Sequence, residues 1–300
     1  EYSGFDGATV PICTFTLAKS HVSNFMGSYI RLSDFRGSEN QAPKTLEAIN
    51  NPDCGWFFNA KPDDFKKIPG SPIAYWISNK IHEIFEKNLS MKDVVSAAVG
   101  LQTGDNNLFL RLWQEVSIRR VGFGLENREQ AQFSSKKWFP YNKGGEYRKW
   151  YGNQEYLVNW ENDGLEIREN VDENGKQRSR PQNTEFYFRP SVSWSDVTSS
   201  TNAFRYFPHG FIHDVKGQSA FSNSEAERYK LLSLLNSNFI KYLMPILNPT
   251  ISFQVGNFNQ LPYLNLSSDI SRNIQIAKLD WDSYETSWDF TQNPTIRPQQ

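Results

Sequence analysis

Cysteine, histidine and long apolar runs are scarce in this sequence, and each shortage excludes a class of protein. Cys13 and Cys54 are the only two cysteines in 300 residues, and neither belongs to a Cys-x-x-Cys or Cys/His cluster. This excludes a disulfide scaffold and a clustered metal site, and it fits a reducing, cytoplasmic setting. The longest apolar stretch, Leu231–Ile251, is interrupted by asparagines, a lysine and a proline. It is therefore too broken to span a membrane.

Familiar catalytic motifs are also missing. His209 and His213 are four residues apart but lack the His-Glu-x-x-His pattern, and there is no Walker loop or Gly-x-Ser-x-Gly string. Gly122-Phe-Gly124 lacks the third glycine of a dinucleotide-binding loop. A pair of carboxylates brought together by folding stays open as an alternative. The sequence itself predicts no catalytic residue and no metal ligand in this chain.

The net charge is −1, from 32 basic and 33 acidic residues, so any affinity for nucleic acid has to come from local clustering. Between Arg111 and Trp150, nine basic residues stand against four acidic ones, a net of +5. The next segment, Tyr151–Gly175, has seven acidic residues and one basic residue, a net of −6. Basic character returns at Lys176, Arg178, Arg180 and Arg189. Two basic segments thus flank an acidic one.

Aromatic residues are abundant, with 22 Phe, 13 Tyr and 9 Trp, which predicts that some of them lie on a working surface. The segment Lys136–Tyr151 interleaves five cations with six aromatics around Gly144-Gly145. Cations bind phosphates and aromatic rings stack on unpaired bases, so the segment is predicted to form a nucleic-acid-binding surface. The alternative is a hairpin whose aromatics face the core while its charges face water.

A second polar cluster lies in the segment Gly100–Phe109, after an apolar strand and before a predicted helix. It concentrates Gln102, Thr103, Asp105 and Asn106 in one glycine-containing loop. Such side chains can contact base edges, and such a loop can hold phosphate through its N–H groups. A turn and a helix cap would explain the same residues. Two further segments, 189–196 and 248–254, are each more typical of structural turns.

Short strands, turns and a few helices predict a mixed α/β (α+β) fold and not a doubly wound one. Hydrophobic periodicity and turn residues locate the elements. We predict strands at Thr9–Leu17, Ser28–Leu32 and Ile251–Val255, and helices from about Ile73 to Lys87, from Glu225 to Leu243 with Pro245 as its stop, and from Asp269 to Tyr284.

Longer strings resemble a known family. They are Gly100–Asn106, Lys137–Asn153, Val158–Gly164 and Asn248–Gly256. All are similar to the PglX family, the adenine-specific DNA methyltransferases of BREX phage-defence systems, which are related to type IIG restriction-modification enzymes with a TaqI-like specificity domain. The similarity runs through nearly all 300 residues.

The resemblance implies a domain organisation. The opening strings Phe5–Cys13 and Tyr29–Gly37 are similar to the end of the family's methyltransferase domain. The implied domains are the last strands of a truncated methyltransferase domain (1–70), a connector helix (71–90), a DNA target-recognition domain (91–266), and a helix and polar tail leading to a further C-terminal region (267–300).

The family's catalytic turn, Asn-Pro-Pro followed by an aromatic, is not matched in this sequence. Asn-Pro occurs at Asn51, Asn248 and Asn293, each time without the second proline and the aromatic, and the glycine-rich S-adenosylmethionine loop is absent. The chain starts at Glu1 without an initiator methionine, so we expect a piece of a longer polypeptide. This piece should hold no cofactor and be inactive alone, while S-adenosylmethionine serves the parent enzyme.

The resemblance implies double-stranded DNA as the partner, because an enzyme that flips a base out of the helix needs a domain that clamps the duplex and contacts neighbouring bases. The expected phosphate contacts are Lys136, Lys137, Lys143, Arg148, Lys149 and Arg180. The expected base-reading or wedge residues are Gln102, Thr103, Asn106, Arg111, Trp150 and Trp194. One alternative is a module that docks defence proteins or an acidic phage DNA mimic. Another is an aromatic carbohydrate-binding module, against which the basic segment argues.

Overall fold

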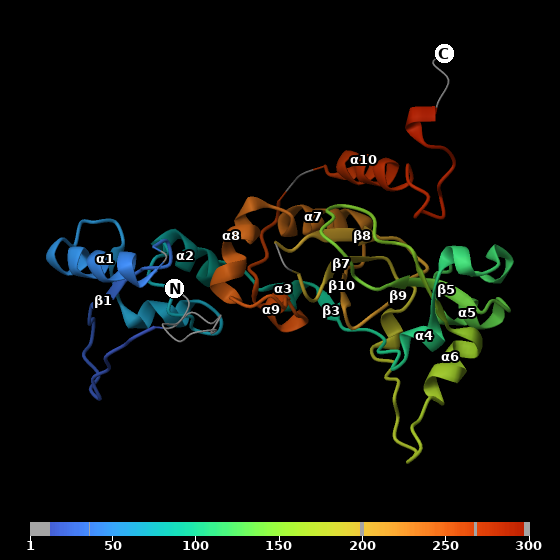
Figure 1. Ribbon diagram of the computed structural model, residues 1–300, viewed down its shortest axis with the longest axis horizontal. Helices are drawn as coiled ribbons and strands as arrows, with labels where there is room; N and C mark the ends of the chain where they lie inside the picture. The colour runs from blue at the N-terminus through green and yellow to red at the C-terminus, as the bar shows by residue number, and fades with distance from the viewer. Residues whose placement is uncertain (1–12, 36, 199–200, 267–268, 297–300) are drawn as a thin grey trace. The chain divides into compact units, whose positions relative to one another are not determined.

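The chain forms two compact units, Glu1–Asn88 and Leu89–Gln300, in a computed structural model (Figure 1). The structure describes residues 13–35, 37–198, 201–266 and 269–296. Within these ranges no helix is long and apolar enough to cross a membrane. The same ranges contain no group of three or more His, Cys, Asp or Glu side chains that could hold a metal ion.

Within its described residues, the first unit contains one antiparallel strand pair, two α-helices and one 3-10 helix. β1 (Gly27–Ile30) pairs with β2 (Phe57–Ala60), and the helices are α1 (Ser38–Asn50) and α2 (Asn79–Lys87). The strand expected at 28–32 is confirmed as β1, whereas residues 13–17 form no strand and 9–12 lie outside the described residues. The helix expected from Ile73 begins only at Asn79, because residues 72–77 form turns and Ser78 is extended.

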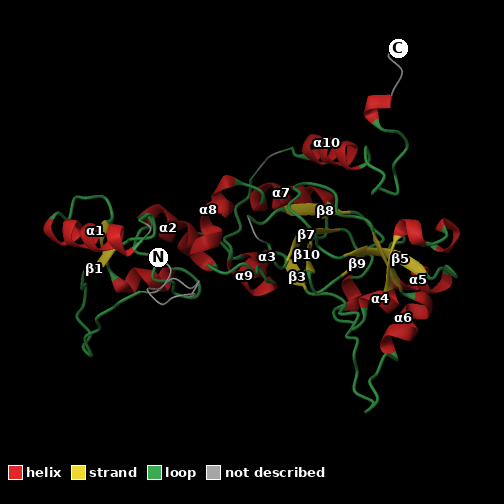
Figure 2. Cartoon of the chain, viewed as in Figure 1, coloured by secondary structure: helices red, strands yellow, loops and turns green. Residues whose placement is uncertain are grey.

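The second unit is built on two short four-stranded sheets (Figure 2). One sheet has the order β3-β10-β7-β8 and is antiparallel throughout. The other has the order β4-β6-β5-β9, in which only β5 and β9 are parallel. The strands are β3 (Ser96–Ala98), β4 (Leu110–Leu112), β5 (Trp138–Asn142), β6 (Tyr156–Asn159), β7 (Ser191–Ser195), β8 (Phe204–Phe207), β9 (Ile212–His213) and β10 (Gly217–Phe221).

Helices of the second unit cover these sheets. α7 packs against β7 and β8, α3 and α9 pack together with α9 against β3, and α5 and α6 pack together with α6 against β6 (Figure 1). The helices are α3 (Met91–Val94), α4 (Asn106–Phe109), α5 (Arg128–Phe133), α6 (Glu161–Arg168), α7 (Glu225–Leu235), α8 (Asn238–Leu247), α9 (Val255–Gln260) and α10 (Ser271–Trp281). Short 3-10 helices lie at 113–115, 118–120, 184–186 and 294–296 in this unit and at 62–67 in the first unit. The predicted mixed α/β fold class is confirmed.

Two predictions for elements of the second unit were wrong. The single helix expected over Glu225–Leu243 is two helices, because the Ser237 hydroxyl accepts a hydrogen bond from the Ile240 N–H and starts α8. Pro245 lies inside α8 and does not end the preceding helix. The strand expected at 251–255 is an irregular segment that leads into α9.

Most of the aromatic residues in the basic segment belong to the core. β5 is buried along its whole length, because one of its faces packs into the cluster around Trp160 and Tyr187 and the other packs around Leu157. The buried aromatics of segment 136–151 are Trp138, Phe139, Tyr141 and Tyr151. Tyr147 is exposed and Trp150 is half-buried. The segment is therefore not the stacked aromatic surface that its sequence predicted, and for these four rings the core-facing alternative holds.

Candidate nucleic-acid interface

The glycine-containing loop that follows β3 is fixed to a second segment of backbone. Gln102 and Arg180 exchange both backbone hydrogen bonds, with N–O distances of 3.0 and 2.7 Å. Gly104 has a left-handed φ of +74°, and a Cβ there would lie 2.6 Å from the Arg178 carbonyl oxygen. Only glycine lets the two segments approach this closely. The loop is therefore a rigid platform that carries exposed side chains.

Side chains from three places in the sequence lie on this platform. The buried Thr103 hydroxyl donates to Asn106 Oδ1 over 2.6 Å, and the Lys143 ammonium lies 3.3 Å from the same oxygen. Gln102, Asn106 and Arg180 are exposed beside them. We call these five residues the loop cluster: Gln102, Thr103, Asn106, Lys143 and Arg180. Asp105 only caps α4, so the structural alternative holds for that residue.

A buried carboxylate holds Lys143 in the loop cluster. Asp214 Oδ2 lies 2.9 Å from Lys143 Nζ and accepts a hydrogen bond of 2.7 Å from the Tyr141 hydroxyl. The other oxygen, Oδ1, accepts from the Lys216 N–H over 2.6 Å. Burial, and next the charge of Asp214, raise the pKa of Tyr141 well above its ordinary value, so this hydroxyl stays a donor. Asp214 therefore fixes the Lys143 ammonium at the tip of the side chain, while part of that side chain stays exposed.

The predicted cations at the edge of β5 are engaged within the protein. Lys137 forms ion pairs of 3.1 and 2.9 Å with Glu161 and Glu166, and these carboxylates raise its pKa. Lys136 donates a hydrogen bond to a backbone carbonyl. Arg111 also donates to a backbone carbonyl, and its guanidinium lies 5.6 Å from the centre of the Trp138 ring. The acidic segment thus neutralises part of the basic one at this edge. None of these three residues belongs to the loop cluster.

Arg148, Lys149 and Trp150 form a third group. Arg148 pairs with Asp280 at 2.7 Å, and the Lys149 ammonium donates to the Asn236 carbonyl over 3.0 Å. The Trp150 backbone pairs with β8, and its φ of +74° is unusual for a non-glycine residue. These contacts tie the segment 148–150 to the surrounding elements. Eleven of the twelve predicted site residues therefore fall into three groups, and only five of them belong to the loop cluster.

Trp194 lies in none of these three groups. Its indole is completely buried, stacks on Phe258 with ring centroids 5.0 Å apart, and donates from Nε1 to the Phe253 carbonyl over 2.8 Å. A wedge that enters a base step must be exposed. Trp194 is therefore a packing residue, and we remove it from the candidate interface.

Arg205, which the sequence analysis missed, braces the segment that follows Lys143. Its guanidinium is fully buried and donates to the carbonyls of Glu146 and Arg148 at 3.3 and 3.4 Å and to the Ser195 hydroxyl at 3.1 Å. Among the described side chains, no carboxylate lies within ion-pair distance of Arg205. Burial lowers its pKa to about 10, so it remains a cation at neutral pH. The sequence Phe-Arg-Tyr-Phe of β8 did not predict that Arg205 is buried and donates hydrogen bonds to this segment, because an arginine in a strand usually faces solvent.

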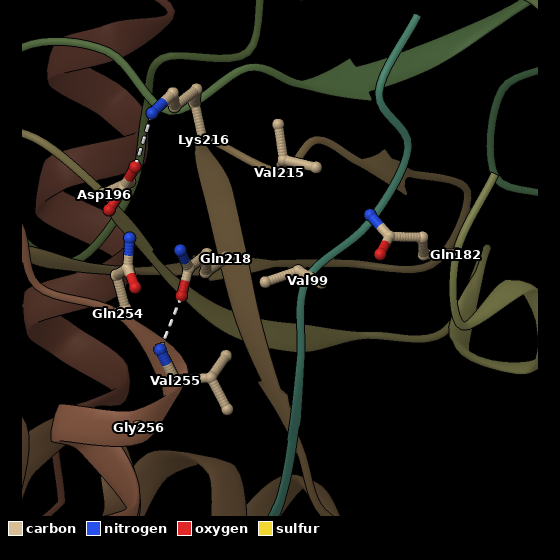
Figure 3. A pocket seen from close by; sticks show the side chains of 9 residues that line it. All are labelled: Val99, Gln182, Asp196, Val215, Lys216, Gln218, Gln254, Val255 and Gly256. Atoms are coloured by element: carbon tan, nitrogen blue, oxygen red, sulfur yellow. Dashed lines mark hydrogen bonds and ion pairs between the residues drawn. The ribbon is translucent and has the colours of Figure 1, made fainter. Parts of the chain in front are cut away.

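The second unit also contains a cavity of about 320 Å³ (Figure 3). We call it the amide pocket. It is lined by Val99, Gln182, Asp196, Val215, Lys216, Gln218, Gln254, Val255 and Gly256. Gln182 connects it to the loop, because its Nε2 donates to the Gly100 carbonyl over 3.2 Å.

The two segments that looked structural in the sequence, 189–196 and 248–254, meet at this pocket. The Phe253 N–H donates to the Asp196 carbonyl over 2.7 Å, and the Ser252 hydroxyl donates to the Asp196 carboxylate over 2.6 Å. The second carboxylate oxygen pairs with Lys216 at 2.6 Å. The sequence analysis could not join these segments, because the contacts between them span more than fifty residues.

Comparisons with known proteins agree with the resemblance to the PglX family that the sequence indicates. No protein-family model matches the chain. It is 38% identical over 294 residues to the adenine-specific methyltransferase PglX of Lacticaseibacillus casei, covering 96% of this chain and 24% of that protein. It is 34% identical over 301 residues to the adenine-specific methyltransferase BrxX of Escherichia coli O9:H4, covering 98% of this chain and 23% of that protein. The similarity to PglX expected from the sequence is therefore confirmed along nearly the whole chain, which spans about a quarter of the length of the curated relatives it matches.

Proposed function

We propose that residues 91–266 recognise double-stranded DNA for an adenine-N6 DNA methyltransferase of the restriction-modification or BREX type. The observation that carries the proposal is the loop cluster, in which amide, hydroxyl and cationic side chains meet on one rigid platform. The names of the two relatives support an adenine methyltransferase as the larger context.

The loop cluster has the chemistry of a DNA contact. Lys143 and Arg180 supply positive charge for phosphates, and Gln102 and Asn106 supply amides that can hydrogen-bond base edges. Asp214 fixes the Lys143 ammonium before any ligand arrives. A cation held in place loses less side-chain freedom on binding than a mobile one. The platform therefore suits recognition of a regular backbone such as a duplex.

Methyl transfer belongs elsewhere in this proposal. We assign residues 1–70 to the end of the catalytic domain, 71–90 to a connector and 267–300 to the passage toward a further region. The flipped adenine and S-adenosylmethionine would bind to parts of the longer protein outside this sequence. The 300-residue chain would contribute the grip on the duplex and the choice of site.

Salt dependence of duplex binding tests the proposal. The 300-residue chain should bind duplex DNA with a log K that falls linearly with log salt, and Lys143→Ala with Arg180→Ala should reduce that slope by about 0.9 per lost phosphate contact on every sequence. Lys137→Ala is the matched control, because Lys137 is paired with two carboxylates, Glu161 and Glu166, and lies outside the loop cluster, whereas Lys143 is paired with one carboxylate, Asp214; it should leave the slope unchanged.

Two outcomes would overturn the proposal. One is a duplex affinity that stays the same between about 50 and 200 mM salt. The other is tight binding of an acidic protein through Lys143 and Arg180 by a chain that binds no duplex. That second result would instead support a protein-docking module.

A further inference from the structure

A hairpin formed by residues 169–180 joins the loop cluster at one end. Its two arms pair at Val171 and Gln177, and the Arg178 N–H donates to the Asn170 carbonyl over 2.9 Å. The second arm, 176–180, ends at Arg180, whose backbone is paired with Gln102 of the loop cluster. In Figure 1 the hairpin extends below α6, away from the two sheets. The second arm is thus held by the first arm and by the loop.

Alternate side chains of the second arm are bound to the protein. Gln177 Nε2 donates to the carbonyls of Arg168 and Asn170 over 3.0 and 3.2 Å. Ser179 is fully buried, and its hydroxyl donates to the Thr103 carbonyl and accepts 2.7 Å from Asn170 Nδ2. Successive side chains of an extended strand point to opposite faces. The residues on either side of Gln177 and Ser179 therefore face away from these contacts.

Those outward-facing residues are all cations. Lys176, Arg178 and Arg180 are exposed, and within the described part of the chain none of them pairs with a carboxylate. We call these three residues the cationic arm. Alternate residues of a strand are about 6.6 Å apart, so the cationic arm spans about 13 Å. Unlike Lys137 and Arg148, its charges are not neutralised by the protein.

The acidic residues of the hairpin lie apart from the cationic arm in the sequence. Glu169, Asp172 and Glu173 belong to the first arm and the turn. The Asp172 carboxylate accepts hydrogen bonds of 2.9 Å from the N–H groups of Asn174 and Lys176, so it stabilises the turn. Three acidic and three basic residues cancel over the whole hairpin. A polyanion is therefore attracted only where it follows the second arm.

We infer that the cationic arm lies along the phosphate backbone of the target duplex and continues the contact that the loop cluster begins. Each DNA strand carries one phosphate per about 3.4 Å of helix axis, so a row of this length faces several phosphates. The inference rests on the proposed function and adds Lys176 and Arg178 to the interface.

The composition of the hairpin favours duplex DNA over other partners. Residues 169–180 include no aromatic residue, so they offer no stacking platform for unpaired bases. Their only large apolar side chain is Val171, on the first arm. A protein interface centres on a cluster of large anchoring side chains in well-packed pockets, which this hairpin does not supply.

Lys176→Gln with Arg178→Gln tests the inference, because glutamine keeps a polar side chain and removes the charge. The slope of log K against log salt for duplex binding should become shallower by about 1.8, which is 0.9 for each lost phosphate contact. The loss should be the same on every sequence, since phosphate contacts carry no base preference. Each single substitution should give about half of it, and the single variants repeat the test if the double variant does not fold.

Lys241→Gln with Arg272→Gln is the matched control. It removes two exposed positive charges from α8 and α10 of the same unit and should leave the slope unchanged. Neutral methylphosphonates, placed one at a time along each strand of the duplex, then locate the contact. A run of positions on one strand should weaken binding of the unchanged chain. In the variant at Lys176 and Arg178, part of that run should lose its effect, next to the positions that respond to Lys143→Ala.

Three outcomes would overturn the inference and leave the proposed function standing. One is a slope that Lys143→Ala reduces but the double variant at Lys176 and Arg178 does not. Another is an equal reduction in the matched control, which would show a dependence on net charge alone. The third is a double variant that loses binding to an acidic protein while its duplex binding is intact. Absence of duplex binding by the unchanged chain would overturn both proposals.

Discussion

Replacement of Trp194 by phenylalanine separates packing from DNA contact at a residue that the sequence placed in the interface. The indole stacks on Phe258 at 5.0 Å and meets Phe253 edge-on at 5.8 Å, and its Nε1 donates to the Phe253 carbonyl. Phenylalanine keeps a ring in the stack. It loses the donor and part of the ring system.

The expected cost follows from these two losses. A buried carbonyl left without its donor costs about 1–3 kcal/mol. The smaller ring leaves a void in the core, which adds about 1–2 kcal/mol. Trp194→Phe should therefore lower the free energy of unfolding by roughly 2–5 kcal/mol. Because the indole is fully buried, it should not change the duplex affinity of the folded protein.

Urea unfolding and a duplex titration under native conditions measure the two quantities separately. A lower unfolding free energy with affinity within twofold of the unchanged chain is the expected pair of results. If stability is unchanged while affinity falls tenfold or more, the indole contacts DNA and our description of this core is wrong.

Three further substitutions test contacts of the second unit. Arg205→Met should speed amide hydrogen exchange in the loop that Arg205 braces. Arg228→Met is the control, because it removes a similarly buried arginine that donates to a different loop, and it should leave that exchange unchanged. Equal exchange of the loop in the two variants would contradict the bracing role. Burial lowers the pKa of His213 from 6.5 to about 3, so only the unfolded chain gains a proton as pH falls between these values. The unfolding free energy should then drop by about 1.4 kcal/mol per pH unit, and His213→Gln should remove that part of the acid dependence; an identical pH profile would refute it. Gly100→Ala places a Cβ 1.7 Å from the His213 carbonyl oxygen. It should lower the free energy of unfolding, measured by thermal or urea unfolding, by more than about 3 kcal/mol. A decrease of less than about 1 kcal/mol would show that the backbone shifts to make room.

Local signals in the sequence were sufficient for the fold class and for several elements. The Ser224 cap and the apolar spacing after it located the start of α7, and β-branched and aromatic residues located β1. The break between α7 and α8 was not visible. There the Asn236 side chain exchanges hydrogen bonds with the Phe204 backbone at 3.2 and 2.9 Å. A contact across 32 residues therefore decides where the helix ends.

Local sequence signals likewise identified only part of the candidate site. The loop 100–106 could be identified because its polar side chains are close in sequence, and Lys143 and Arg180 because of their charge. The neutralised state of Lys137 could not, because its partners Glu161 and Glu166 come from a later segment. The amide pocket was equally hidden, since Gln182, Gln218 and the backbone of Val255 become neighbours only after the sheets form.

The position of Asp214 has a consequence for how such a surface can diversify. This carboxylate anchors Lys143 with help from Tyr141 and a backbone N–H, and the pocket glutamines take no part in that anchoring. Exchanging residues at the pocket wall would thus leave the charged anchor intact. Under the proposed function, the contact of Lys143 with phosphate would therefore not depend on which residues line the pocket.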